Sequence, residues 1–310
     1  MRNWNRRRFI TAAGGAAGAA LAAGAAPAHA APRAQQAEAC APLRIVTGEE
    51  DFVCPSTAPP GASVFRVTAT SFKTGFLGLV RLRDGHEEGA FRELLYALFS
   101  ARTPQETIEA TRGLMDTAEL YGGAAVHPGA VSYITPVLEP GSYLVLEYRD
   151  FQGPLGREPE RGQEHVRTLT VTEPVTGTAA AAATGSAATL TTRETAEGPR
   201  FELHGQPGAG SPVRCVNQVT QPDEAIIYRV PDDSVTEEDV HAFFNSDMSM
   251  TPPFSIEAPL GTPPISPGGD LWVTMPTEPG RYVAASWVGS LEDGRPMAAH
   301  GQHLIFHVTA

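Results

Sequence analysis

Residues 127–148 read HPGAVSYITPVLEPGSYLVLEY, residues 266–287 read SPGGDLWVTMPTEPGRYVAASW, and the two stretches align without a gap at an offset of 139. Tyr133/Trp272 and Tyr148/Trp287 keep an aromatic residue at matching positions. The identical pairs are Pro128/Pro267, Gly129/Gly268, Thr135/Thr274, Glu139/Glu278, Pro140/Pro279, Gly141/Gly280 and Tyr143/Tyr282. Agreement at this many positions marks an internal repeat, so the chain is predicted to contain two copies of one structural unit.

Each copy of the repeat has the pattern of a β-arch. A Pro-Gly turn precedes an alternating strand, and a Glu-Pro-Gly turn precedes a second strand that begins at the tyrosine. Further strands are predicted at residues 213–217 and 225–230 in the second half, and at residues 78–82 in the first. The 31 Gly and 27 Pro residues of the chain favour many turns and short strands. The fold class is therefore predicted to be mainly β, with a helical insertion in each half.

Two consecutive helices are predicted in the first half. The apolar residues of the first helix fall at i, i+3, i+4, i+7 and i+8, namely Phe91, Leu94, Leu95, Leu98 and Phe99. Thr103 is the predicted cap of the second helix, with Pro104 at the first helical position and Glu106 completing a capping box. We expect the apolar stripes to pack on the sandwich rather than to form a partner-binding groove.

A third, short helix is predicted over residues 235–244, with Ser234 as its cap and Glu237 three residues later. Residues 173–198 are rich in Ala and Thr and are interpreted as a linker. The predicted organisation is an N-terminal extension at 31–59, a first domain at 60–172 and a second domain at 199–310.

The first thirty residues have the features of a twin-arginine (Tat) signal peptide. Arg6, Arg7 and Arg8 precede an Ala/Gly-rich run, which ends in an Ala-His-Ala cleavage site at residues 28–30. We therefore expect a secreted or extracytoplasmic protein with no membrane span. The net charge of −12 becomes −16 after cleavage, because four arginines are removed with the signal. A chain this acidic is not expected to bind nucleic acid.

Three cysteines follow the signal peptide. Cys40 and Cys54 bracket a short segment, and an oxidising compartment favours a disulfide between them. Cys215 is left over and is interpreted as a small buried residue of the strand at 213–216.

The order of these elements resembles the cupredoxin-like fold, in particular the exported bacterial domains that carry a helical insertion. The resemblance rests on the strand Val-Arg-Cys-Val-Asn at 213–217, the turn at Pro222 and Asp223, and the Glu-Pro-Gly-x-Tyr motif of each half. It implies two Greek-key β-sandwich domains in tandem.

The residues of a type 1 copper site are missing from both halves. Such a site needs two histidines and a cysteine thiolate. Asp223 stands where the resemblance implies the first histidine, and neither 283–287 nor 144–148, the strands that would supply the thiolate, contains a cysteine. The alternative metal ligands are Met297, His300 and His303, which we expect to bind copper only loosely if they bind it.

These observations predict an exported, non-catalytic binding or structural protein that has no type 1 copper site and no cofactor. Its partner is expected to be a protein or a small molecule outside the cytoplasm. Two alternatives remain open. One is a copper-handling protein that uses Met297, His300 and His303, and the other is an enzyme with a site built on the sandwich loops.

Overall fold

The computed structural model describes residues 41–310 except 153–158, 160, 174–186 and 247–248. The described chain is mainly β, with two mixed sheets and three α-helices. Each sheet has nine strands, and the two sheets face each other across one extended hydrophobic core. The predicted fold class is confirmed at this level.

The first sheet has the strand order β12-β11-β13-β16-β8-β5-β1-β2, with β4 paired to β8. Its strands are β1 (Leu43–Thr47), β2 (Phe52–Val53), β4 (Gly61–Ala62), β5 (Phe65–Ala69), β8 (Ser132–Leu138), β11 (Ala188–Thr195), β12 (Gly198–Gly205), β13 (Pro212–Asn217) and β16 (Asp270–Thr274).

The second sheet has the strand order β18-β17-β14-β15-β7-β6-β9-β10-β3. Its strands are β3 (Thr57–Ala58), β6 (Phe76–Leu82), β7 (Ala118–Ala125), β9 (Gly141–Glu147), β10 (Val166–Val171), β14 (Asp223–Arg229), β15 (Ser255–Ile265), β17 (Gly280–Ala285) and β18 (His303–Val308).

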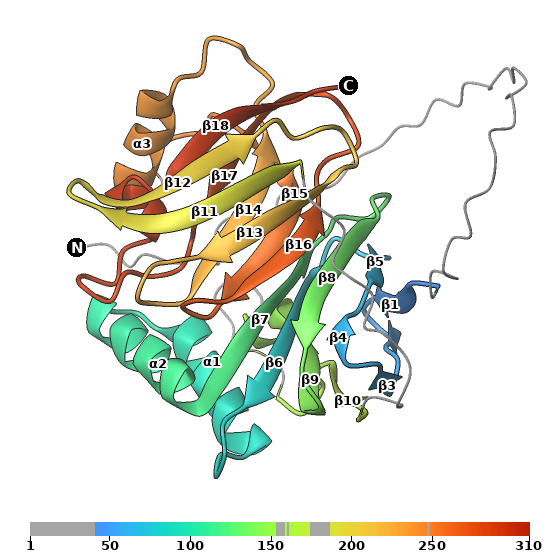
Figure 1. Cartoon of the computed structure of the whole chain (residues 1–310). Helices are drawn as coiled ribbons and strands as arrows, with labels where there is room; N and C mark the ends of the chain where they lie inside the picture. The colour runs from blue at the N-terminus through green and yellow to red at the C-terminus, as the bar shows by residue number, and fades with distance from the viewer. Residues whose placement is uncertain (1–40, 153–158, 160, 174–186, 247–248) are drawn as a thin grey trace, which may run out of the picture.

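The two halves of the chain are joined edge to edge in both sheets. β8 of the first half pairs antiparallel with β16 of the second, and β7 pairs with β15 (Figure 1). The hydroxyl of Thr274 adds a side-chain hydrogen bond across the first of these junctions, to the carbonyl of Tyr133 at 3.0 Å. Backbone pairing of this kind holds the halves in one fixed relation, so residues of both can build a single site.

The repeat found in the sequence is also a structural repeat. Gly141 and Gly280 have φ angles of 146° and 153°, which only glycine adopts without strain. The hydroxyls of Tyr143 and Tyr282 donate to the carbonyls of Glu139 and Glu278, at 3.0 Å and 2.9 Å. The repeated Glu-Pro-Gly-x-Tyr motif is therefore a turn that the tyrosine side chain ties to its own start.

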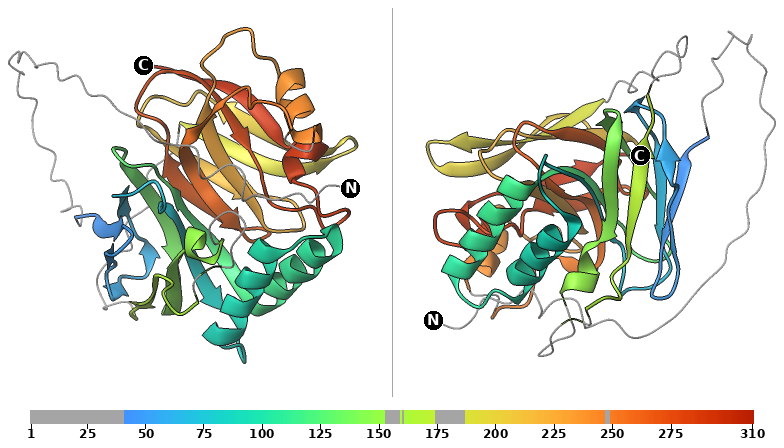
Figure 2. Two further views of the ribbon diagram at one scale, coloured as in Figure 1. Left: turned by 180° about the vertical axis from the view of Figure 1, so that it is seen from behind. Right: turned by 90° about the horizontal axis from the view of Figure 1, so that it is seen from below.

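The hairpin of α1 (Glu88–Ser100) and α2 (Pro104–Thr117) covers the outer face of the second sheet in the first half. Figure 2 shows these helices on one side of the green strands and the blue strands on the other. Phe91 and Leu95 are fully buried against sheet residues such as Leu146, as the apolar spacing predicted. The capping box of Thr103 and Glu106 is present as predicted.

The predicted cap of the third helix was wrong. α3 (Glu237–Asn245) begins two residues later than expected, and its N-cap is Thr236, which forms a capping box with Asp239. The backbone N–H of Ser234 instead bonds the carboxylate of Asp232 within a turn. Glu237 does not take part in the capping box, and its carboxylate instead hydrogen-bonds His303 of the last strand, β18.

Two segments interpreted as lying outside the sandwich carry strands. Ala188–Thr195, in the interpreted linker, is β11, which pairs parallel with β13 because Ala188 and Leu190 are buried in the core. Leu43–Thr47, in the interpreted N-terminal extension, is β1, which pairs parallel with β5 and buries Ile45. The linker residues 174–186 and the signal peptide lie outside the described residues. None of the described helices is long and apolar enough to span a bilayer.

Candidate functional site

The three residues proposed as metal ligands have separate partners in the structure. Met297 is buried in a small apolar cluster with Val219 and Val288. His300 hydrogen-bonds Asp293 at 3.0 Å, and His303 hydrogen-bonds Glu237 at 2.7 Å. Among the described residues, no group of three or more His, Cys, Asp or Glu side chains is arranged to hold a metal ion.

Side chains alternate along β18, so Leu304, Phe306 and Val308 should face the interior and the histidines of the strand the other side. Phe306 and Val308 are indeed buried and His307 is exposed. His303 is covered, since α3 lies over it and leaves its side chain only 7% exposed. Its second ring nitrogen lies 3.4 Å from Nδ1 of His241, so both nitrogens of His303 are engaged with α3.

Asp223, at the position where the resemblance implied a copper histidine, is a buried carboxyl group held by side chains. Its Oδ1 accepts a hydrogen bond from the hydroxyl of Ser286 at 2.6 Å, and its Oδ2 accepts one from the amide of Gln302. Burial raises the pKa of Asp223 to about 7, and the neighbouring Glu224 adds to the effect while these hydrogen bonds oppose it. The carboxyl group of Asp223 is therefore partly protonated near neutral pH.

The described cysteines are free thiols. Cys215 is buried in β13 as predicted, and burial raises its pKa to about 12, which makes it a poor nucleophile. Cys54 is half-buried and its thiol donates to the carbonyl of Pro55 at 3.3 Å. Cys40, the partner of Cys54 in the predicted disulfide, lies outside the described residues, so the disulfide stays a prediction.

A concave site lies on the outer face of the second sheet, where the two halves meet. We call it the junction pocket. Its volume is about 140 Å³. The first half supplies Phe72, Phe76, Leu95, Leu98, Phe99, Thr111, Leu114, Leu120, Tyr148, Arg149 and Gln152. The second half supplies Pro222, Glu224, Ile226, Tyr228, Ile256, Glu257, Pro259, Pro263, Pro264, Trp287, Val288 and Gly289. The helical hairpin thus forms one wall of a mostly apolar cavity, as small-molecule sites commonly are.

The repeat positions Tyr148 and Trp287 meet in this pocket from opposite halves. Each follows the strand that comes after the Glu-Pro-Gly turn, β9 in one half and β17 in the other. Their aromatic character, kept between the two copies, therefore has a structural reason: both side chains line one cavity at the junction of the sheets.

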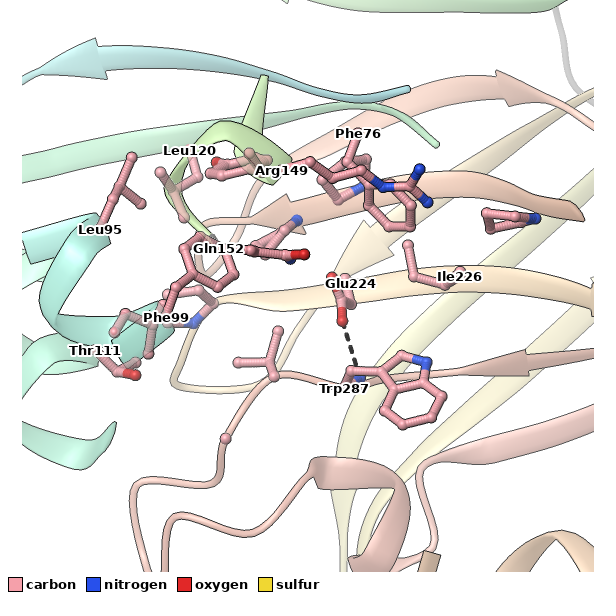
Figure 3. Close-up of a pocket in the computed structure, with 18 of the residues that line it drawn as sticks. Phe76, Leu95, Phe99, Thr111, Leu120, Arg149, Gln152, Glu224, Ile226 and Trp287 are labelled. Carbon is pink, nitrogen blue, oxygen red and sulfur yellow. Dashed lines mark hydrogen bonds between the residues drawn. The ribbon is translucent and has the colours of Figure 1, made fainter. Parts of the chain in front are cut away.

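Arg149 is the basic residue of the pocket. Its guanidinium donates a hydrogen bond to the carbonyl of Thr74 at 2.9 Å and another to the carbonyl of Phe72. It also lies 4.5 Å from the centre of the Phe76 ring, a cation–π contact visible in Figure 3. Burial lowers the pKa of Arg149 from its ordinary value, although the group remains a cation.

Glu224 is the buried acid of the pocket. In Figure 3 it lies between Ile226, Gln152 and Trp287, and its Oε1 accepts a hydrogen bond from the backbone N–H of Trp287 at 2.9 Å. A buried carboxyl group in an apolar cavity requires strong hydrogen-bonding partners, and it is correspondingly able to orient a polar ligand group.

Two hydroxyl groups of the pocket are buried and have no hydrogen-bond partner among the described residues. They belong to Tyr148, which is 6% exposed, and Thr111, which is 4% exposed. A buried hydroxyl without a partner costs about 1–3 kcal/mol. Such groups in the wall of a cavity indicate where a polar atom of a ligand would bind.

Glycine at position 78 makes room for the Tyr148 ring. A Cβ atom placed on Gly78 would lie 2.7 Å from Cζ of Tyr148, too close for any unstrained contact. The Gly78→Ala variant is expected to push the ring into the pocket and to lower the free energy of unfolding by about 1–3 kcal/mol. Urea denaturation measures this loss. Gly89→Ala is the control, since nothing lies within 4 Å of a Cβ at that exposed helical position, and equal losses in the two variants would contradict the prediction.

Sequence reasoning did not identify the junction pocket. The helices whose stripes were expected to pack on the sandwich do so, and Leu95, Leu98 and Phe99 also line the pocket. The one available signal was the aromatic pair Tyr148/Trp287 in the repeat. Arg149 and Glu224 could not be identified as pocket residues from the sequence. A single charged residue beside a predicted strand is usually exposed, and only the folded structure shows that these two are buried.

Comparison with known proteins gives only distant structural likenesses. No protein-family profile matches the sequence, and no curated protein is significantly similar to it. The match with auracyanin B covers 39% of this chain and 87% of the auracyanin chain, at 16% identity and a TM-score of 0.25. A copper nitrite reductase from Nitrosomonas europaea is similar to 86% of this chain, over 92% of its own, at 11% identity and a TM-score of 0.23.

A multicopper oxidase from Pediococcus acidilactici is similar to 81% of this chain, over 50% of its own length, at 7% identity and a TM-score of 0.23. The chain is thus structurally similar to cupredoxin and multicopper oxidase chains at low TM-scores. Its membership of the cupredoxin-like family remains the prediction made from the sequence.

Proposed function

We propose that this chain is an exported, non-catalytic binding protein that holds a small, mainly apolar molecule in the junction pocket. The observation that carries the proposal is the pocket itself, with aromatic walls from both halves and buried hydroxyls that have no protein partner in the described chain. The Tat-type sequence at residues 1–30 supports a place of action outside the cytoplasm.

A binding role fits the pocket better than an enzymatic one. Its ionisable lining residues are Glu224, Glu257, Arg149 and two tyrosines, and the described lining contains no cysteine, serine or histidine that could act as a nucleophile or base. Arg149 already donates to two carbonyls of its own half. The arrangement therefore fits the binding of a ligand between fixed polar groups better than catalysis by a nucleophile–base pair.

A tryptophan reporter tests whether the pocket is open to small apolar molecules. The chain contains Trp4, Trp272 and Trp287, so the Trp4→Phe/Trp272→Phe double variant leaves only the pocket residue Trp287. Nitrobenzene, a one-ring quencher, is expected to quench this emission in a saturable way with a stoichiometry near one, because it occupies a defined site.

The matched control is the Trp4→Phe/Trp287→Phe double variant, which keeps only Trp272 on β16. Trp272 lies under the guanidinium of Arg214 in the first sheet and does not line the pocket. Its quenching should rise linearly with nitrobenzene concentration, as collisional encounters do. Linear quenching of Trp287 as well would remove the support for a binding function.

A further inference from the structure

The polar atoms of the junction pocket restrict the chemistry of its ligand, given the binding function proposed above. The Tyr148 hydroxyl is buried without a partner among the described residues. Burial raises its pKa well above the ordinary tyrosine value, and the nearby Glu224 raises it further, so the group keeps its proton. A neutral tyrosine hydroxyl offers one hydrogen atom, and the ligand has to supply an oxygen that accepts it.

Glu224 makes the complementary demand. Its Oε1 already accepts the backbone N–H of Trp287, but a carboxylate has about four acceptor positions and can receive a further proton donor from the ligand. A ligand atom beside Tyr148 and Glu224 therefore has to accept one hydrogen bond and donate another. A hydroxyl group does both with a single atom, whereas an ether or ketone oxygen only accepts.

The size of the cavity limits the apolar part of the ligand. Its volume of about 140 Å³ is close to the roughly 150 Å³ of an engineered cavity that binds benzene. Phe76, Phe99 and Trp287 supply flat aromatic walls. One six-membered ring fits this space.

Charge excludes the ionic versions of such a ligand. A carboxylate would lie near the acidic Glu224 and Glu257, and the guanidinium of Arg149 is already bonded to two carbonyls. An ammonium group has no lone pair to receive the Tyr148 proton, and it would lose its hydration shell in a mainly apolar cavity.

We propose that the junction pocket binds a neutral one-ring alcohol, whose oxygen accepts a hydrogen bond from Tyr148 and whose hydroxyl proton is donated to Glu224. The apolar ring lies among Phe76, Phe99 and Trp287.

Four probes that differ only in the group attached to one phenyl ring test this assignment by calorimetric titration of the full chain. Benzyl alcohol is expected to bind with a Kd about tenfold lower than that of toluene, and benzoate and benzylamine to bind more weakly than benzyl alcohol. Tyr148→Phe and Glu224→Gln are each expected to raise the Kd of benzyl alcohol about five- to tenfold and to leave that of toluene unchanged.

Tyr133→Phe is the matched control, since Tyr133 is an exposed residue of β8 outside the pocket, and it should change neither affinity. Equal binding of toluene and benzyl alcohol, or tightest binding of benzoate or benzylamine, would overturn the ligand class while saturable nitrobenzene quenching still supports the pocket. If no probe binds and Trp287 is quenched only by collision, the binding function fails as well. Circular dichroism of each variant separates a lost hydrogen bond from a lost fold.

Discussion

The Asp223→Asn variant is expected to be more stable than the parent chain at neutral and alkaline pH, and equally stable in acid. In the folded protein, burial raises the pKa of Asp223 to about 7, from an ordinary value of 3.8. The folded state therefore binds more protons than the unfolded state between these values. It follows by linkage that this carboxyl group makes the free energy of unfolding fall as the pH rises through that window.

The expected size of the effect is large because the group is fully buried. The difference between the variant and the parent should be near zero below about pH 4 and should approach about 4 kcal/mol above about pH 8. An asparagine has the shape of a protonated aspartate, so Ser286 can still donate to its oxygen. Its side-chain NH2 can donate to the side-chain oxygen of Gln302 once the amide group of Gln302 is rotated by about 180°.

Urea denaturation of both proteins at several pH values measures this difference directly. Groups that do not interact with Asp223 titrate alike in both chains and cancel in the comparison, whereas the interaction with Glu224 is part of the measured effect. Asp84→Asn, at an exposed turn, is the control, and this surface substitution should change the free energy of unfolding by less than about 0.5 kcal/mol. A difference of the same size at every pH would mean that the variant acts through packing rather than through ionisation.

Replacing Glu147 by alanine is expected to cost about 3–5 kcal/mol of stability, because it leaves several buried donors without an acceptor. The carboxyl group of Glu147 is fully buried at the end of β9 and accepts hydrogen bonds from the hydroxyl of Thr47 and from the backbone N–H groups of Gly75 and Phe76, at 2.7, 2.7 and 2.9 Å. Burial raises its pKa, and these three bonds act in the opposite sense.

Glu147→Gln provides the graded comparison for this site. Its remaining oxygen can still accept the Phe76 N–H, and the Thr47 hydroxyl can turn to accept from the new amide. The backbone N–H of Gly75 would then face the NH2 group of the glutamine instead of an acceptor. We therefore expect an intermediate loss of about 1–3 kcal/mol in the free energy of unfolding. Urea denaturation should rank the parent above Gln and Gln above Ala. Equal stability of the Ala and Gln variants would show that hydrogen bonding is not what Glu147 contributes.

Both buried carboxyl groups support the junction pocket from beneath. Glu147 fixes the strand end that continues into Tyr148 and Arg149, and Asp223 ties the start of β14 to Ser286, next to Trp287. The two positions belong to different halves, and Ser286 is the repeat equivalent of Glu147. At this repeat position, therefore, both halves place a buried polar side chain that hydrogen-bonds a neighbouring strand, a carboxyl group in one half and a hydroxyl group in the other.

The sequence by itself determined the local structure of this protein. The Glu-Pro-Gly-x-Tyr repeats fixed two matching turns, because a glycine with positive φ and a tyrosine hydroxyl bonding four residues back act within one short segment. The capping box at Thr103 and the apolar spacing of α1 were readable for the same reason. Interactions between near neighbours in the chain leave a pattern that does not depend on the rest of the fold.

The tertiary structure alone decided where the halves meet and what they enclose. The pairing of β7 with β15 and of β8 with β16 joins residues more than a hundred positions apart, and the sequence carries no signal for that register. Ala188–Thr195 became a strand because β13 lay beside it, although its Thr-rich composition indicated a linker. Tyr148, Arg149, Glu224 and Trp287 form one pocket only after both sheets have joined, since a site shared by two halves exists in no local segment of either.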